Sequence, residues 1–229
     1  MGVDQASAIV GLSSPLVLAS ASPRRAEVLR MLGLSFTVSP ADVEERLARG
    51  EHPFAYVERL SREKAGAVSP AGTDGLTIAG DTVVVLDGRI LEKPADKAEA
   101  AATLTSLSGR VHEVYSGLTL AYRGRMVSRV ARARVAFRRA ERGMIDSYVE
   151  TGEPLDKAGS YGIQGYGAAL VESIEGDYFT VVGLSVAAFV GLLPELGLAY
   201  RPGGVFVADP LSQVASAPGA SGPAQGAGS

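Results

Sequence analysis

Two adjacent arginines occupy a position that is electrically unfavourable for them. In the stretch SASPRRAEVL, residues 20–29, a helix is predicted to begin with Ser22 as its N-cap and Pro23 as its first residue, which places Arg24 and Arg25 in the first turn. The N-terminal end of a helix is partially positive, so each arginine is disfavoured there by about 0.3–1 kcal/mol. A bound anion would offset this repulsion, and phosphate oxygens suit both arginine forks and helix N–H groups.

A lysine is predicted at the border of a buried helix face. In a helix over residues 54–68, Phe54, Val57 and Leu60 share one apolar face, and Lys64 follows Leu60 by four residues. The spacing alone leaves two interpretations open. The lysine either lays its stem over apolar surface with its ammonium group in water, which is the commoner case, or directs its charge into a buried site.

A predicted hairpin brings an acid and a base together. The stretch TIAGDTVVVLDGRILEKP contains Asp87-Gly88 between two apolar runs, which is typical of a type I′ turn. Counting back from this turn predicts three cross-strand pairs: Leu86 with Arg89, Val84 with Leu91, and Thr82 with Lys93. Asp81 and Lys93 then lie at the same end of the hairpin, either as a structural ion pair or as parts of a site.

Further carboxylates are available to complement these cations. The stretch ADVEER supplies Asp42, Glu44 and Glu45, in addition to Asp81 at its predicted strand end. Carboxylates and phosphate oxygens together commonly hold Mg²⁺, which activates a water or bridges phosphoryl oxygens. The residues by themselves therefore indicate a phosphate-bearing ligand, with or without a metal ion, and leave the reaction open.

A long glycine-rich loop is predicted over residues 152–167, GEPLDKAGSYGIQGYG. Glycine allows positive φ and a close approach of the backbone to a ligand, so such a loop inside a compact domain indicates function. It is not a Walker loop, because no G-K-[ST] closes it, and it lacks the strand-to-helix context of a Rossmann fingerprint.

The composition restricts the class of protein. The 229 residues are 46% hydrophobic and carry a net charge of -3, which is typical of a globular protein and not of one that coats nucleic acid or anionic lipid. The chain has no cysteine, which excludes disulfides, thiolate zinc sites and cysteine nucleophiles and suits the cytoplasm.

The N-terminal apolar stretch mimics a signal peptide, but no Lys or Arg precedes Arg24, so a buried strand at 16–19 is preferred. No apolar run approaches the ~20 residues of a membrane span.

One surface pattern could serve nucleic acid instead. In RVARARVAFRR, Arg132, Arg134 and Arg138 alternate with apolar residues, which gives a strand one basic and one apolar face. No aromatic residues interleave with the arginines. The pattern therefore favours a solvated face of an antiparallel strand over a surface that binds phosphate backbones.

Strand-like and helix-like segments alternate along the chain, which indicates an α/β architecture with mixed sheets. One domain is predicted over 15–205, between an N-terminal extension, 1–14, and a tail rich in Ala, Gly, Ser and Pro, 206–229, whose composition predicts disorder. The further element signals are a helix end at Gly33, a helix from the Asp96–Glu99 capping box to Gly109, helices over 144–151 and 185–196, and a hairpin at Glu175-Gly176.

An ordered set of motifs gives the chain a family resemblance. The pieces are LASASPRR, VEER, REKA, GDTVVV, LEKP, LSGRVHEVYSG, PLDKAGSYGIQGYG and GDYFTVVGL. Together they resemble the Maf family of nucleoside triphosphate pyrophosphatases, which is related in fold to the inosine triphosphate pyrophosphatases, over about residues 16–200. The resemblance implies an elongated, mixed and twisted β-sheet flanked by helices, in two lobes with a central cleft.

The resemblance also implies a reaction. It is hydrolysis between the α- and β-phosphates of a nucleoside triphosphate, with Mg²⁺, Mn²⁺ or Co²⁺, to give the monophosphate and pyrophosphate. Asp81 matches the family base that takes a proton from the attacking water, and Glu45 and Asp81 match the acids that would hold the metal. The residues that the resemblance places near the phosphates are Ser20, Ser22, Arg24, Arg25, Lys64 and Lys93.

Three positions carry over a substrate preference. The family branch that acts on dTTP and UTP has an arginine, a threonine and a glutamine where this chain has Arg24, Thr82 and Gln164. A glutamine amide can pair with a carbonyl and an N–H of one base, which suits discrimination. The chain departs from the family at Gly80, where G-A-D is usual before the threonine, and at Ser185, where proline is usual.

Other readings stay open beside this resemblance. One is the family branch that acts on 7-methyl-GTP, and another is a nucleotide-binding protein without turnover that inhibits septum formation, since the family is linked to arrest of cell division. A homodimer is expected from the resemblance, whereas nucleic acid and membranes are not expected as partners. His52 and His112 are spaced in no metal pattern, and His112 is interpreted as structural or as a neighbour of the site.

Overall fold

The computed structural model describes residues 15–69 and 75–208. Among these residues, seven strands form one mixed sheet in the order β2-β1-β3-β5-β6-β7, with β4 paired to β3, and β8 and β9 form a small second sheet. The strands are β1 Leu16–Leu18, β2 Phe36–Val38, β3 Leu76–Leu86, β4 Arg89–Leu91, β5 Val111–Tyr122, β6 Arg125–Phe137, β7 Val171–Glu175, β8 Leu198–Arg201 and β9 Gly204–Val207. The predicted α/β class with a mixed sheet is confirmed.

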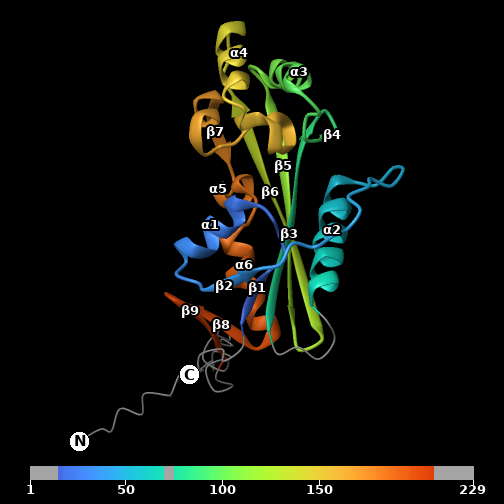
Figure 1. Ribbon diagram of the computed structural model, residues 1–229, viewed down its shortest axis with the longest axis vertical. Coiled ribbons are helices and arrows are strands. Elements are labelled where there is room, and N and C mark those ends of the chain that lie inside the picture. Colours follow the sequence, from blue (N-terminus) through green and yellow to red (C-terminus); the bar gives the residue numbers. More distant parts are fainter. Residues whose placement is uncertain (1–14, 70–74, 209–229) are drawn as a thin grey trace, which may run out of the picture.

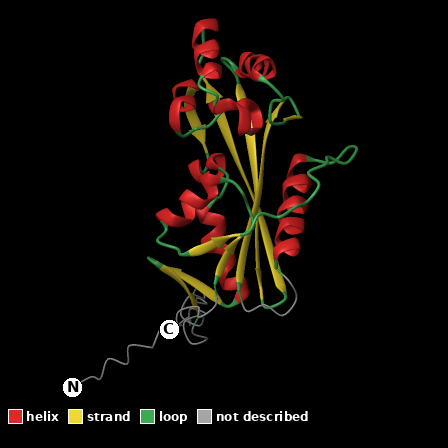
Figure 2. Cartoon of the chain, viewed as in Figure 1, coloured by secondary structure: helices red, strands yellow, loops and turns green. Residues whose placement is uncertain are grey.

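Helices cover both faces of this sheet (Figures 1 and 2). The α-helices are α1 Pro23–Met31, α2 Pro53–Val68, α3 Lys97–Leu107, α4 Arg142–Glu150, α5 Tyr178–Val182 and α6 Val186–Leu192. Short 3-10 helices are η1 Glu153–Asp156, η2 Ala158–Ser160, η3 Gly165–Leu170 and η4 Leu193–Leu196. Figure 1 shows β3, β5 and β6 running the length of an elongated molecule, with α2 on one face, α1 and α6 on the other, and α3 and α4 at the far end.

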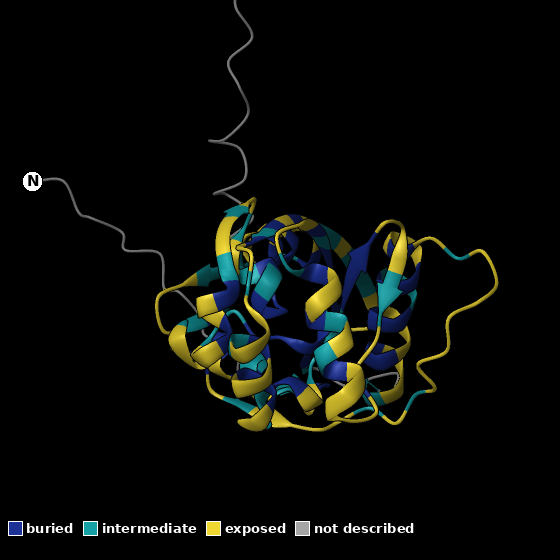
Figure 3. Cartoon of the chain, turned by 90° about the horizontal axis from the view of Figure 1, so that it is seen from above, coloured by how far each residue is buried: buried dark blue, intermediate teal, exposed yellow. Residues whose placement is uncertain are grey.

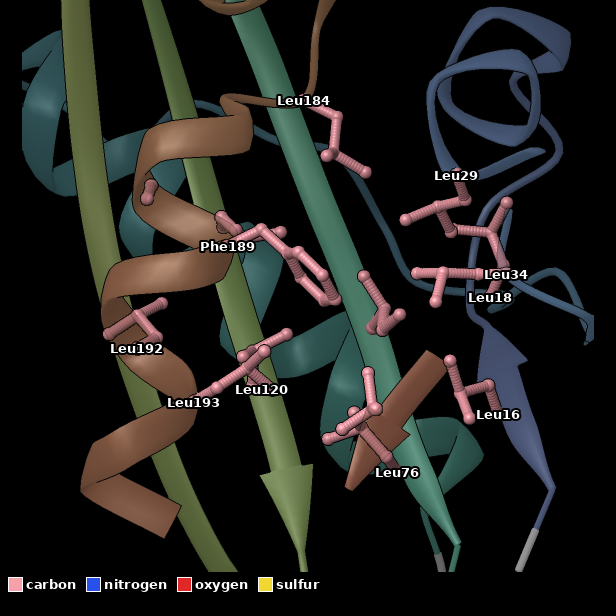
Figure 4. Packing of buried hydrophobic residues seen from close by; sticks show 14 of the residues in the cluster. Leu16, Leu18, Leu29, Leu34, Leu76, Leu120, Leu184, Phe189, Leu192 and Leu193 are labelled. Atoms are coloured by element: carbon pink, nitrogen blue, oxygen red, sulfur yellow. The ribbon is translucent and has the colours of Figure 1, made fainter. Parts of the chain in front are cut away.

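Two large hydrophobic cores lie at different heights along the long strands. In one, Leu29 of α1 and Phe189 of α6 pack against Leu18 and Leu76 of the sheet (Figure 4). The second core lies at the α3 and α4 end and includes Leu104, Leu107, Val135, Phe137 and Ile145. Buried residues line the inward faces of the strands and helices (Figure 3). Each fully buried side chain of this kind contributes about 1.5–3 kcal/mol, so each half has its own source of stability.

Helix α2 lies close against the opposite face of the sheet. A Cβ on Gly117 of β5 would stand 2.3 Å from the Val57 carbonyl oxygen, so this approach requires glycine. Val57 and Leu60 are buried as predicted, but Phe54 is 46% exposed, and its predicted place on the buried face is wrong. The helical period explains this result, because six residues rotate Phe54 by about 120° from Leu60.

The predicted hairpin is confirmed near its turn and wrong beyond it. Val84 pairs with Leu91 and Leu86 with Arg89, and φ is 51° at Asp87 and 76° at Gly88, as a type I′ turn requires. The predicted third pair, Thr82 with Lys93, does not form because β4 ends at Leu91. The Glu92 carbonyl instead accepts a hydrogen bond from the Gly159 N–H at 3.2 Å, which draws the chain toward the glycine-rich loop.

The predicted helix ends have clear physical causes. Helix α1 begins at Pro23 after Ser22, and Gly33 follows it with a φ of +74°. Asp96 caps α3 by accepting from the Glu99 N–H at 2.8 Å. Ser185 caps α6 by accepting from the Ala188 N–H at 3.2 Å, so the serine that replaces the usual proline starts this helix well.

Two boundaries differ from the sequence prediction. The predicted hairpin at Glu175-Gly176 is wrong, because β7 ends there and Asp177 caps α5 by accepting from the Phe179 N–H at 3.1 Å. The predicted domain end at residue 205 falls inside β9, so the folded part extends at least to Val207. The extension over 1–14 and the tail beyond 208 lie outside the described residues.

The basic strand face and the buried histidine have structural roles. Arg132 pairs with Glu113, and Arg134 pairs with Glu175 at 2.7 Å, so this face of β6 is a solvated, charge-paired surface. The His112 Nε2 lies 2.8 Å from the Tyr161 hydroxyl, and burial lowers the pKa of His112 to about 4. The imidazole is therefore neutral at neutral pH. No helix among the described residues is long and apolar enough to cross a membrane.

Candidate active site

A cavity of about 330 Å³ contains residues from both halves of the molecule. It lies beside β3 and is walled by the turn before α1, the segment before α2, the glycine-rich loop and the turn after α5. It collects every predicted site residue except Gln164: Ser20, Ser22, Arg24, Arg25, Glu45, Lys64, Asp81, Thr82 and Lys93. Of the three acids in ADVEER, Glu45 lines the cavity and Asp42 and Glu44 do not.

Lys64 joins the two predicted acids. Its Nζ lies 2.6 Å from Asp81 Oδ1 and 2.6 Å from Glu45 Oε1. The side chains of Lys64 and Asp81 are each 8% exposed, whereas that of Glu45 is 46% exposed. The simpler interpretation of Lys64, an ammonium group in water, is therefore wrong, because α2 delivers the charge to a buried carboxylate on the central strand.

The surrounding cations favour the ionised form of Glu45. Burial raises the pKa of Glu45, but the hydrogen bond and charge of Lys64, helped by Lys93 and Arg25, outweigh burial and leave the pKa below its usual value. Two anions and several cations thus share one partly enclosed space. Such a space suits a negatively charged ligand, which would bind the Lys and Arg side chains, together with a positive ion, which would bind the carboxylates.

Arg25 connects three walls of the cavity. Its Nε donates to the Gly183 carbonyl at 2.9 Å, Nη1 donates to Ser20 Oγ at 2.9 Å, and Nη2 donates to Thr82 Oγ1 at 3.1 Å. Thr82 Oγ1 also lies 3.1 Å from Ser116 Oγ of β5. Arg25 therefore fixes the turn before α1 against β3 and the turn after α5, and it presents its remaining N–H groups from a rigid position.

Gly80 leaves room for this arginine. A Cβ at position 80 would lie 3.2 Å from Arg25 Nε and 3.2 Å from the Gly117 carbonyl oxygen. An alanine there would require small shifts of one neighbour or the other. The departure from the usual G-A-D sequence thus loosens the contact between β3 and Arg25 without removing a charged group.

The anion opposite Arg24 in this structure is a side chain. Arg24 Nη1 lies 3.2 Å from Asp156 Oδ2 of η1, and Lys157 Nζ lies 2.6 Å from Asp156 Oδ1. Burial raises the pKa of Asp156, but the hydrogen bonds and charges of Lys157 and Arg24 leave it below its usual value. The exposed Arg24–Asp156 pair is worth at most about 1 kcal/mol, so a triphosphate can displace Asp156 at little cost.

The far end of the cavity is largely apolar. Val84, Val114, Tyr161, Ile163 and Val181 line it, and they belong to β3, β5, the glycine-rich loop and α5. Gln164 directly follows this lining but does not belong to it, and its Oε1 is buried with no hydrogen-bond partner among the described residues. The charged end suits phosphates and the apolar end suits a flat base.

Sequence reasoning missed some residues of this site. Asp156 and Lys157 lie within the quoted motif PLDKAGSYGIQGYG, but the sequence analysis used only the glycines and Gln164 of that loop. Their charges inside a glycine-rich loop were the available cue. The apolar lining gave no cue, because valines in strands are ordinary core residues until the fold shows which of them face a cavity.

The comparison with protein families supports the chemical picture. The family model described as Maf-like protein matches residues 15–196 of this chain. The chain belongs to the Maf family. The matched range of this Maf protein includes every residue of the cavity, from Ala19 to Gly183.

Curated relatives cover most of the chain. A protein of Moorella thermoacetica named dTTP/UTP pyrophosphatase is 51% identical over 81% of this Maf protein and 96% of its own length. One of Myxococcus xanthus with the same name is 50% identical over 80% of this chain and 93% of its own length. A solved HAM1 protein from Coxiella burnetii aligns with 69% of this chain and 80% of its own, at 16% identity and a TM-score of 0.40.

Proposed function

We propose that this protein hydrolyses dTTP and UTP between the α- and β-phosphates to give the nucleoside monophosphate and pyrophosphate. The relatives named dTTP/UTP pyrophosphatase support this proposal. The observation that carries it is the buried Lys64–Asp81 pair, joined to Glu45, in the same cavity as Arg24 and Arg25. This arrangement combines an anion-binding end with a carboxylate that can accept a proton.

The reaction follows from these placements. The triphosphate lies among Arg24, Arg25, Lys64 and Lys93, which offset its charge. A water attacks the α-phosphorus while Asp81 accepts a proton from it, the new P–O bond forms, and the bond to the departing pyrophosphate breaks. Lys64 donates a hydrogen bond to Asp81 Oδ1 and so fixes the orientation of the carboxylate. This single displacement requires no protein nucleophile, so a chain without cysteine can carry it out.

Glu45 and Asp81 fit a divalent metal. Lys64 engages one oxygen of each carboxylate, and no other hydrogen bond from residues 15–69 or 75–208 reaches the second oxygens. Within the described residues no three His, Cys, Asp or Glu side chains gather, so phosphate oxygens and waters would supply the remaining ligands, as is common for Mg²⁺. When bound, Mg²⁺, Mn²⁺ or Co²⁺ would withdraw charge from the phosphoryl oxygens.

The base would lie at the apolar end of the cavity. Tyr161 and Ile163 line this end, and Gln164, whose Oε1 is buried without a hydrogen-bond partner among the described residues, is the next residue along the chain. Arg24 and Thr82 belong to the charged end, where Thr82 supports Arg25. The preference for pyrimidines thus depends on the glycine-rich loop and on Gln164, and it remains part of the proposal.

The protein is further proposed to act as a homodimer in the cytoplasm. The cysteine-free chain suits a reducing compartment, and the resemblance to the Maf family supports the dimer. A link to septum formation belongs to the same family resemblance. Size-exclusion chromatography with light scattering measures the assembly directly, and a monomeric mass would overturn the dimer.

The proposed reaction is tested by its products. The protein is incubated with dTTP, UTP, CTP, GTP or 7-methyl-GTP, with Mg²⁺ or Mn²⁺ or with excess EDTA, and pyrophosphate and orthophosphate are measured separately. We expect pyrophosphate from dTTP and UTP with either metal and almost none with EDTA. Orthophosphate as the first product would overturn cleavage at the α–β bond, and a preference for 7-methyl-GTP would overturn the role given to Gln164.

A further inference from the structure

The carboxylate of Glu153 lies outside the cavity and binds the glycine-rich loop, which forms the wall at the apolar end. Glu153, the first residue of η1, does not line the cavity, but its carboxylate accepts three hydrogen bonds. Oε1 accepts from the Tyr148 hydroxyl at 2.9 Å and from the Gly167 N–H at 3.1 Å, and Oε2 accepts from the Tyr166 N–H at 3.0 Å. Glu153 therefore ties the end of the glycine-rich loop to α4.

Tyr148 ties the start of the same turn. Its hydroxyl accepts from the Gly162 N–H at 3.1 Å while it donates to Glu153, so one hydroxyl serves both. Burial raises the pKa of Tyr148, which keeps the hydroxyl protonated and able to donate at neutral pH. The two side chains thus grip both ends of a turn, residues 162–167.

Two glycines allow this turn to lie close against the two side chains. A Cβ at Gly165 would stand 2.7 Å from Glu153 Oε2, and Gly165 has a φ of +71°. A Cβ at Gly167 would stand 2.6 Å from the Tyr148 hydroxyl and 2.3 Å from the Gly162 carbonyl oxygen. Gly165 and Gly167 are therefore explained by close packing against Glu153 and Tyr148.

The opposite side of the turn faces the cavity. Gly162 and Ile163 line it, and Gln164 is the next residue. Lys157, another lining residue, donates to the Glu153 carbonyl at 2.6 Å, so Glu153 supports the wall from its backbone as well. A displacement of Glu153 or Tyr148 would therefore also displace the turn whose residues would contact a base.

We propose that Glu153 and Tyr148 are positioning residues for base recognition, which set the turn 162–167 and thereby the discrimination between UTP and CTP. This inference rests on the proposed function. The two substrates differ only at the edge of the base, where UTP has a carbonyl and an N–H and CTP has an amino group and a bare nitrogen. A turn that moves by a fraction of an ångström loses that distinction while the phosphate end is unchanged.

Two variants and two matched controls test the proposal. Glu153→Gln keeps the shape but turns an NH₂ group toward at least one N–H donor, and Tyr148→Phe removes the shared hydroxyl. The first control, Glu150→Gln, changes an exposed carboxylate that pairs with Lys97 and belongs to α4, the helix that also contains Tyr148. Tyr166→Phe removes a hydroxyl from the turn itself, where the bond to Glu153 comes from the backbone N–H and the ring is 72% exposed.

The readouts separate positioning from a general structural role. For Glu153→Gln and Tyr148→Phe we expect KM for UTP to rise about tenfold, kcat to change less than about twofold, and the UTP-to-CTP ratio of kcat/KM to fall at least about fivefold. Inhibition by inorganic tripolyphosphate, which reports on the phosphate end alone, should be unchanged. Glu150→Gln and Tyr166→Phe should match the parent in every readout.

Each outcome bears on one proposal or the other. A parent protein that cleaves no triphosphate would overturn the proposed function and this inference with it. A parent that cleaves UTP, with variants that keep the parent UTP-to-CTP ratio, would overturn this inference alone. Variants that lose kcat and tripolyphosphate binding in equal measure would also overturn it, because they would show damage to the whole cavity.

Discussion

Replacing Asp81 with asparagine is expected to lower kcat for dTTP by about 10²–10⁴-fold, the usual contribution of a general base, while the protein still binds the triphosphate. The amide keeps the shape and can still accept a hydrogen bond from Lys64, but it cannot accept a proton from water. Asp81 lies 2.6 Å from Lys64 Nζ and its side chain is only 8% exposed, so the substitution changes a buried carboxylate of the cavity. Pyrophosphate release measures kcat, and calorimetric titration with a slowly hydrolysed dTTP analogue measures binding.

The matched control is Asp87→Asn in the same hairpin. Asp87 is exposed in the turn after β3, pairs with Arg110 at 2.7 Å, and does not line the cavity. This variant should keep the parent kcat. If Asp81→Asn instead keeps parent turnover, Asp81 is not the base and the proposed mechanism is wrong; if it loses binding and turnover together, Asp81 serves the ligand and not the water.

Replacing Lys64 with methionine is expected to lower the free energy of unfolding by about 3–5 kcal/mol, because it leaves a buried carboxylate without its partner. Asp81, in a side chain only 8% exposed, would then lose its counter-charge, and Glu45 would lose the cation that lowers its pKa. Activity should fall together with stability. Urea unfolding monitored by circular dichroism measures the change.

Measuring the free energy of unfolding at acid pH tests whether loss of the ion pair causes the instability of Lys64→Met. Glu45 has a lowered pKa in the folded protein, so its contribution to stability is present above its ordinary pKa and is lost as the pH falls through the lowered value. The difference in free energy of unfolding between the parent and Lys64→Met should therefore narrow as Glu45 takes up a proton. A gap that is unchanged at acid pH would assign the loss to packing of the lysine stem instead.

Lys97→Met is the control for this second prediction. Lys97 pairs with Glu150 at 2.8 Å, and the two side chains are 50% and 71% exposed. Exposed pairs of this kind contribute about 1 kcal/mol or less, so the variant should unfold almost like the parent. A loss of less than about 1 kcal/mol in Lys64→Met itself would show that the Lys64–Asp81 pair is not a buried ion pair in solution.

Local signals in the sequence predicted the elements that position the site. Asp87-Gly88 fixed the register between β3 and β4 because both residues adopt positive φ, and Asp96 and Ser185 marked helix starts through their side-chain caps. These features depend on bonds between residues a few positions apart. Such bonds form in the same way wherever the segment lies in the fold.

Phe54 and the hairpin expected at Glu175-Gly176 failed for local reasons, whereas the other failures came from contacts between distant segments. Thr82 does not pair with Lys93 because the chain at Glu92 bonds to Gly159 of the glycine-rich loop. The pair Arg24–Asp156 joins residues far apart in the sequence, and no spacing rule links them. The buried ammonium of Lys64 likewise depends on β3 passing under α2, which is a property of the sheet and not of the helix.

The family motifs predicted more of the site residues than residue type and spacing did. Residue types and spacing indicated a phosphate-binding turn at Arg24 and Arg25, and the cavity contains both. The hairpin count and the stretch ADVEER had already made Lys93 and Glu45 candidates, and the structure brings both into the cavity. Gln164 came only from the resemblance, and it lies just outside the lining. Neither residue chemistry nor the family motifs pointed to Glu153, because it does not line the cavity and instead contacts the loop that does.

The position of the attacking water tests the central claim most directly. Hydrolysis of dTTP is carried out in H₂¹⁸O, and the products are separated and weighed by mass spectrometry. If the cavity places the α-phosphorus beside Asp81, one ¹⁸O atom enters each dTMP and none enters pyrophosphate. Label in pyrophosphate, with unlabelled dTMP, would show attack at the β-phosphorus and would contradict this placement of the substrate.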